Sequence, residues 1–129
     1  MNKPDDRPRG HLRVGDYPLS EKRPDLIQTR TGKKLDALTV DALKSGAVTM
    51  EDLRITKGAL LMQAEIAEAA GRPRLGSNFQ RAADMVDVPQ DFLLKAYELL
   101  RPGRAKTKRE LLDAAKTFRE QYKAERVAA

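Results

Sequence analysis

The residues of this chain that could do chemistry are few and scattered. The one histidine, His11, lies in a segment broken by Pro and Gly, whereas the histidines of metal and general-base sites normally come in clusters. Carboxylates pair at helical spacing, Glu65 with Glu68 and Asp84 with Asp87. Neither pair has an apolar pocket or a cation that would separate its two pKa values. We therefore expect solvated helix faces, and no catalytic, cofactor-binding or metal-binding residue in this chain.

A basic cluster is the best candidate for binding nucleic acid. Two apolar helical segments flank the turn Asp87-Val88-Pro89, and a helix-turn-helix over residues 77–109 is the alternative interpretation. The second helix argues against it, because Asp91 and Glu98 outnumber Lys95 and most other positions are apolar, whereas a major-groove helix presents Arg, Lys, Asn or Gln. We therefore expect no nucleic-acid partner. The cluster consists of Arg101, Arg104, Lys106, Lys108 and Arg109.

Composition favours a small all-α protein. The 129 residues allow one domain or slightly less, and Ala and Leu dominate while Phe and Tyr number three each. The formal charge of +6 suits nucleic acid, an acidic protein surface or simple solubility equally well. The chain has no Cys, no apolar run long enough to cross a membrane, and no secretory signal in its first residues. These features predict a cytoplasmic protein with no membrane partner.

Three parts are expected along the chain. Residues 1–15 are polar and rich in Pro and Gly, which predicts a flexible tail. Residues 16–38 carry apolar side chains without a helical period and include Pro18 and Pro24, which indicates an extended arm that packs on a partner or on the body. Residues 39–129 predict a helical domain. The expected fold is therefore all-α, with about four to five helices and an extended N-terminal arm.

Capping signals predict where these helices begin and end. Thr39 and Gly46 enclose a helix at 40–45, and a loose capping box starting at Thr49 predicts one further turn. A proper capping box at Thr107 starts the last helix, which has no stop signal and is expected to run to Ala129. Between them, helices are expected at 57–70, 73–86 and 89–100.

Apolar stripes predict which face of each helix is buried. The last helix carries a stripe at Leu111, Ala115, Phe118 and Tyr122. In residues 89–100 the expected inward face carries Leu93, Ala96, Tyr97 and Leu100.

A series of short motifs runs in order from about Asp16 to Tyr122. They are Asp16-Tyr17-Pro18-Leu19, Thr31-Gly32-Lys33, Asp52-Leu53-Arg54-Ile55, Asn78-Phe79 with Arg81-Ala82-Ala83-Asp84, Val88-Pro89, and Leu100-Arg101-Pro102. Each motif is weak alone, but their order and near-matching gaps are specific. By these motifs the chain resembles the small (gamma) subunit of the adenosylcobalamin-dependent diol and glycerol dehydratases, with Asp84 where that family has Glu.

The resemblance implies a non-catalytic role for this chain. Such enzymes contain large, medium and small subunits, usually two copies of each, and turn a 1,2-diol into an aldehyde and water by a radical mechanism. The large subunit holds the diol and a metal ion, and adenosylcobalamin lies between the large and medium subunits. The implied function of this chain is a small, non-catalytic structural subunit of that lyase, with the large and medium subunits as partners and no cofactor bound by the chain itself.

Six residues are our candidates for the subunit interface. An arm fixed by Pro loses less entropy on docking, and Tyr is a common interface anchor. Phe79 could equally serve an internal core, and Arg54 and Arg81 could equally form salt bridges within the subunit. The candidates are Tyr17, Pro18, Leu19, Arg54, Phe79 and Arg81.

Two departures from the family pattern bear on the interpretation. Family chains continue in helix beyond the Ala-Ala matched by Ala128-Ala129, so we expect a truncated or shortened relative. Some relatives also carry a longer N-terminal extension linked to microcompartments, and the short Pro-broken segment here does not predict encapsulation. A further hypothesis is a helical adaptor unrelated to dehydratases. Co-purification with proteins other than dehydratase subunits would favour it.

Overall fold

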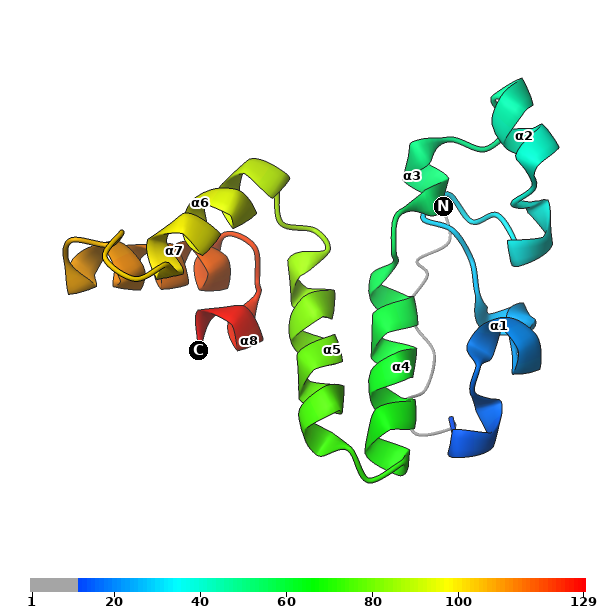
Figure 1. Cartoon of the computed structure of the whole chain (residues 1–129), viewed down its shortest axis with the longest axis horizontal. Helices are drawn as coiled ribbons and strands as arrows, with labels where there is room; N and C mark the ends of the chain where they lie inside the picture. Colours follow the sequence, from blue (N-terminus) through cyan, green and yellow to red (C-terminus); the bar gives the residue numbers. More distant parts are fainter. Residues whose placement is uncertain (1–11) are drawn as a thin grey trace. The chain divides into compact units, whose positions relative to one another are not determined.

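The structure is a computed structural model that describes residues 12–129. His11 and residues 1–11 of the predicted tail lie outside this range. The described residues are helical, and their one β-bridge pairs Gln28 with Lys34 in isolation. The expected all-α fold is therefore confirmed. The chain forms two compact units, the first ending at Phe79 and the second spanning Gln80–Ala129, so helix α5 (Pro73–Met85) crosses the boundary (Figure 1).

The first unit begins with a succession of single turns. These are η1 (Val14–Asp16), α1 (Leu19–Lys22), η2 (Pro24–Leu26) and η3 (Leu35–Ala37). Pro24 starts η2 at a position where its missing N–H needs no partner. The segment contacts the rest of its unit, because η1 lies against α4 (Lys57–Ala69) and Leu19 is buried.

The following helices of the first unit begin where the capping residues predict. Thr39 caps α2 (Val40–Ser45), which ends at Gly46 with a left-handed φ of 82°. Thr49 and Asp52 form a capping box around α3 (Met50–Leu53). Thr56 caps α4 (Lys57–Ala69), whose buried side chains are Leu60, Ala64, Ile66 and Ala67. These local hydrogen bonds place each helix start within a residue of its predicted position.

Helix α5 (Pro73–Met85) approaches α4 closely at Gly76. A Cβ atom at this position would lie 2.9 Å from Cγ of Glu68 and 3.3 Å from the carbonyl oxygen of Ala64. The absent side chain is therefore what allows α5 to pack at this distance from α4.

The second unit packs three helices around a cluster of aromatic side chains. These helices are α6 (Gln90–Leu100), α7 (Lys108–Glu120) and α8 (Glu125–Ala128). The ring of Phe92 lies edge-on to Phe118 with centroids 4.9 Å apart, and lies 5.4 Å from the ring of Tyr122. Together with the buried Val88, Ala96 and Ala124, these rings form the core of the unit.

Two expectations about the second unit are wrong. Tyr97 and Leu100 do not share the buried face of α6, because the core is filled by Phe92, Leu93 and Ala96 and leaves both side chains exposed. The last helix also does not run unbroken to Ala129. Helix α7 ends at Glu120, Lys123 takes a φ of +56°, and a separate short helix α8 follows. The N–H of Ala124 donates back to the carbonyl of Phe118 over 2.9 Å, so burial of Ala124 turns the chain where no glycine or proline marks a stop.

Candidate subunit interface

Two of the short motifs meet in space at a buried carboxylate. The Asp52 side chain is only 1 % exposed, and the Nζ atom of Lys33 lies 3.1 Å from both of its oxygens. The Thr31 hydroxyl donates to Oδ1 of Asp52, and the backbone N–H of Thr49 donates to Oδ2 over 3.0 Å. These hydrogen bonds, with Thr31 contributing most and Thr49 next, hold the pKa of Asp52 well below its ordinary value.

The buried carboxylate ties the turn at residues 29–33 to the start of α3. Within the turn, the N–H of Lys33 donates to the Thr29 hydroxyl over 3.0 Å, and Gly32 adopts a left-handed φ of 87°. Because Asp52 caps α3 and pairs with Lys33 at once, the turn and the helix hold each other in place. Arg54 follows α3 directly and takes its position from this connection.

Arg54 lies at the surface beside a small cavity of the first unit. The cavity has a volume of about 130 Å³, and Arg54, Ile55 and Asp52 contribute to its wall. The Nε atom of Arg54 lies 3.4 Å from Oε1 of Glu51, and both side chains are more than half exposed. Such a surface pair contributes little to stability, so it leaves the guanidinium available to a partner at small cost. The remaining wall consists of Ile27, Gln28, Thr29, Leu35, Leu38, Thr56 and Ala59.

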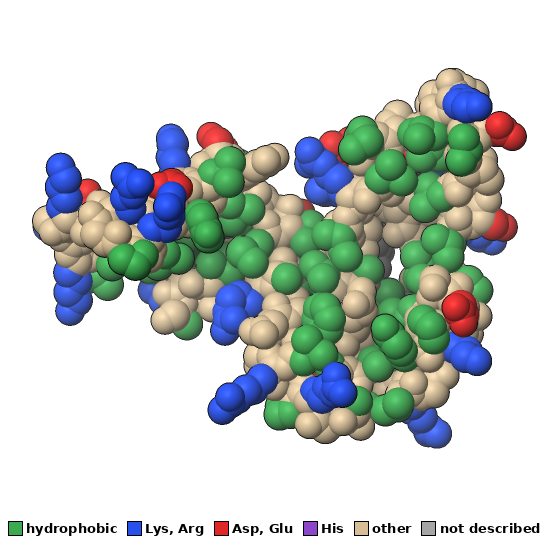
Figure 2. Space-filling view, viewed as in Figure 1, with side chains coloured by type: hydrophobic (Ala, Val, Ile, Leu, Met, Phe, Trp, Pro, Cys, Tyr) green, Lys and Arg blue, Asp and Glu red, His purple; other side chains and the backbone are tan. Residues whose placement is uncertain are grey.

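Exposed apolar side chains lie on α2, α3 and the residues that follow α3, and we call this surface the α2–α3 face. Figure 2 shows hydrophobic side chains gathered over the part of the molecule that carries α2 and α3. Exposed apolar side chains in number mark interaction surfaces more often than single ones do. The sequence did not lead us to predict this face. The signal that could have indicated it is helix length, because helices of six and four residues are too short to bury both their sides. The face consists of Val40, Leu43, Met50, Leu53 and Ile55.

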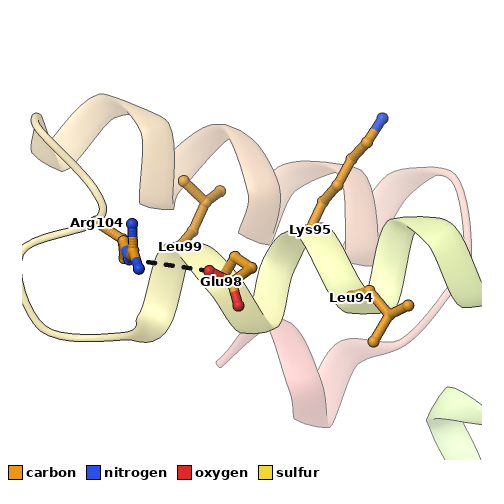
Figure 3. A pocket seen from close by; sticks show the side chains of 5 residues that line it. All are labelled: Leu94, Lys95, Glu98, Leu99 and Arg104. Carbon is orange, nitrogen blue, oxygen red and sulfur yellow. Dashed lines mark ion pairs between the residues drawn. The ribbon is translucent and has the colours of Figure 1, made fainter.

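A second exposed apolar row lies on α6, and we call it the α6 face. Leu94, Tyr97 and Leu100 are 57 %, 65 % and 75 % exposed. Beside it runs an open groove lined by Leu94, Lys95, Glu98, Leu99 and Arg104, with the side chain of Lys95 extended away from the helix (Figure 3).

Cations border this groove and neutralise its one carboxylate. The Nη1 atom of Arg101 lies 3.1 Å from Oε1 of Glu98, and the Nε atom of Arg104 lies 3.9 Å from Oε2. In the second unit, Figure 2 shows Lys and Arg side chains gathered around α6 and α7.

The predicted interface residues of the N-terminal segment differ in accessibility. Tyr17 is 62 % exposed, Pro18 is half-buried, and Leu19 is buried at 7 %. Only Tyr17 and part of Pro18 can therefore touch a partner, while Leu19 anchors the segment from inside. On α5, Phe79 is half-buried and Arg81 is exposed.

One of the two carboxylate pairs has a structural explanation. Oδ1 of Asp84 accepts a hydrogen bond from Nη1 of Arg126, and Oδ2 accepts one from the backbone N–H of Arg126, each over 3.1 Å. Asp84, where the resembling family has Glu, thus connects α5 to α8 across 42 positions of sequence. Its side chain is nearly buried and its role is to hold α8.

Within residues 12–129, no group of three or more His, Cys, Asp or Glu side chains is arranged to hold a metal ion. None of the helices found in that range is long and apolar enough to span a membrane.

Comparison with known proteins points to one family. The model of the family described as "Dehydratase small subunit" matches residues 12–129. The propanediol dehydratase small subunit of Salmonella typhimurium is 46% identical over 117 residues, which cover 91% of this chain and 67% of that protein. The propanediol dehydratase small subunit of Citrobacter freundii shows the same identity and coverage. These matches and the apolar α6 face give the helix-turn-helix alternative no support.

Proposed function

Because this chain belongs to the dehydratase small subunit family, we propose that it works as the structural subunit of a diol dehydratase whose other chains carry out the reaction. The observation that carries this proposal is 46% identity over 91% of the chain to proteins named propanediol dehydratase small subunit. The exposed apolar faces support it, because a subunit that completes its burial against partners needs such surfaces.

The partners in this proposal are the large and medium dehydratase subunits, two copies of each of the three chains. Propane-1,2-diol is the proposed substrate, since both relatives are named for propanediol. Adenosylcobalamin would lie between the large and medium subunits and supply the radical that starts the dehydration. This chain would contribute contacts that hold the assembly together.

We assign the contact with the large subunit to the first unit. Arg54 lies in the chain between Leu53 and Ile55 of the α2–α3 face, so a charged side chain neighbours two exposed apolar residues in the sequence. Arg is favoured at interfaces because its planar fork pairs with carboxylates while its stem packs on apolar surface. Tyr17 would add an aromatic anchor to this contact, and Phe79 and Arg81 on α5 complete the proposed set, with Pro18 and Leu19 shaping the segment behind Tyr17.

Co-expression with the large and medium subunits of a diol dehydratase tests the proposal. We expect a three-chain complex that co-purifies, and a loss of propanediol-dependent aldehyde formation when this chain is omitted. Arg54→Glu combined with Tyr17→Ala should reduce co-purification at least tenfold. Arg72→Glu, at an exposed position after α4, is the matched control. If the wild-type chain elutes alone and activity is unchanged without it, the proposal is wrong. Co-purification with unrelated proteins instead would favour a generic helical adaptor.

A further inference from the structure

Helix α6 is apolar on two faces, and its own unit covers only one. Phe92, Leu93 and Ala96 point into the core formed with α7. The α6 face of Leu94, Tyr97 and Leu100 repeats every three residues along the helix and stays exposed. Burying such side chains against another apolar surface is favourable, because it removes apolar area from water. A helix that needed only one packed face would carry polar residues at these positions.

The surroundings of the α6 face are strongly basic. Residues 94–109 contain six cations, Lys95, Arg101, Arg104, Lys106, Lys108 and Arg109, and one carboxylate, Glu98. Glu98 is already neutralised by two arginines. The next carboxylate, Glu110, is occupied as a cap, since its Oε2 accepts from the N–H groups of Lys106 and Thr107 over 2.7 and 3.0 Å. The charge around the apolar row is therefore net positive, even though Arg109 also pairs with Asp113 at 4.0 Å.

We propose that the α6 face is the docking site for an acidic amphipathic segment of another dehydratase subunit. This inference rests on the proposed function. Leu94, Tyr97 and Leu100 would contact the apolar side of the segment, with one of its side chains entering the groove between Leu94 and Leu99. Its carboxylates would face Lys95, Arg104 and Lys106. Charge of opposite sign around an apolar centre speeds association and sets the orientation of the partner.

The other occupants fit less well. A nucleic acid would satisfy the cations, but its phosphates would leave the Leu-Tyr-Leu row against polar groups. A second copy of this chain would offer a matching apolar row, but a two-fold contact would oppose two basic borders. Only an acidic partner with an apolar side matches both the row and its border.

Two sets of variants in the three-chain complex separate the apolar and charged contributions. Leu94→Ser with Leu100→Ser should lower co-purification at least tenfold at all salt concentrations. Arg104→Glu with Lys106→Glu should lower it similarly at low salt and approach wild type at high salt, where charges are screened. The control is Arg72→Glu with Arg74→Glu, which makes the same change of charge at exposed positions of the first unit and should leave co-purification intact.

Photocrosslinking identifies the occupant directly. With Tyr97 replaced by p-benzoylphenylalanine, irradiation of the purified complex should join this chain to an acidic segment of the large or medium subunit. The same group at Lys116, an exposed position of α7, should not capture that segment. Crosslinks confined to this chain, to a second copy or to nucleic acid would overturn the proposal. Co-purification of both variant sets at the wild-type level would also overturn it. In those cases the wild-type complex still forms and the proposed function stands. If wild type itself fails to assemble, both proposals fail.

Discussion

Lys33 and Asp52 are 19 residues apart in sequence, and the Lys33 Nζ atom lies 3.1 Å from both carboxylate oxygens of Asp52. The same carboxylate caps α3 through the N–H of Thr49. One buried side chain thus joins a turn that carries the Thr-Gly-Lys motif to a helix that carries the Asp-Leu-Arg-Ile motif. The two motifs, separate in the sequence, form one structural unit that presents Arg54.

Replacing Asp52 should make stability depend less on pH. The pKa of Asp52 is lowered in the folded state, so its stabilising effect is full above the ordinary pKa near 3.9 and is lost as the pH falls below that value. Asp52→Asn should therefore lower Tm by several degrees at neutral pH, and the difference from wild type should shrink below about pH 4. Thermal unfolding of both proteins across this range measures the effect. Asp36→Asn, at an exposed position, is the control, and an equal pH profile for all three proteins would contradict the prediction.

Breaking the contact between Asp84 and Arg126 should release α8. Asp84→Ala removes the acceptor of two 3.1 Å hydrogen bonds and leaves the N–H of Arg126 without its partner. The expected loss in free energy of unfolding is about 1.5–3 kcal/mol, with the lower end favoured because Arg126 is partly exposed. Hydrogen exchange at Ala128 and Ala129 should accelerate more than elsewhere in the chain.

A double-mutant cycle distinguishes the direct contact from an indirect effect. Asp84→Ala and Arg126→Ala should show a coupling energy of about 1 kcal/mol. Arg109→Ala, which removes a largely exposed pair with Asp113 at 4.0 Å, should leave exchange in α8 unchanged. Additive effects of the first two substitutions would show that the contact does not hold α8.

Truncating Phe118 should destabilise the second unit strongly. Phe118 is buried and its ring lies 4.9 Å from that of Phe92, so Phe118→Ala leaves a cavity where α6, α7 and α8 meet. The expected loss in free energy of unfolding is about 3–5 kcal/mol, measured by urea denaturation. Leu112→Ala, at an exposed position of the same helix, should change it by less than about 0.5 kcal/mol. Equal effects of the two substitutions would contradict the assignment of the core.

A side chain introduced at Gly76 should push α5 away from α4. Any Cβ there meets Glu68, whose side chain can move, and the backbone carbonyl of Ala64, which cannot move as easily. Gly76→Ala should therefore gain less than the roughly 1 kcal/mol that the change contributes in an open helix. Gly76→Val should be destabilising, and thermal unfolding measures both. Ser77→Ala, at the next and exposed position, is the reference, and a full gain for Gly76→Ala would contradict the close approach.

The sequence alone determined the all-α class and most helix starts. Thr39, Thr56 and Thr107 cap helices as predicted, because a cap is a hydrogen bond between a side chain and a backbone N–H three residues away. Pro102 likewise follows the end of α6 two residues after Leu100. The order of the short motifs identified the family for the same reason, since motif order is a property of the chain itself.

The tertiary structure decided which apolar face of α6 is buried. Periodicity cannot choose between Phe92 with Ala96 and Tyr97 with Leu100, because all are apolar and the choice depends on where α7 packs. The end of α7 at Glu120 was decided in the same way, by burial of Ala124 and by the hold of Asp84 on Arg126. These contacts join residues far apart in the sequence, and their energies exist only once the helices have met.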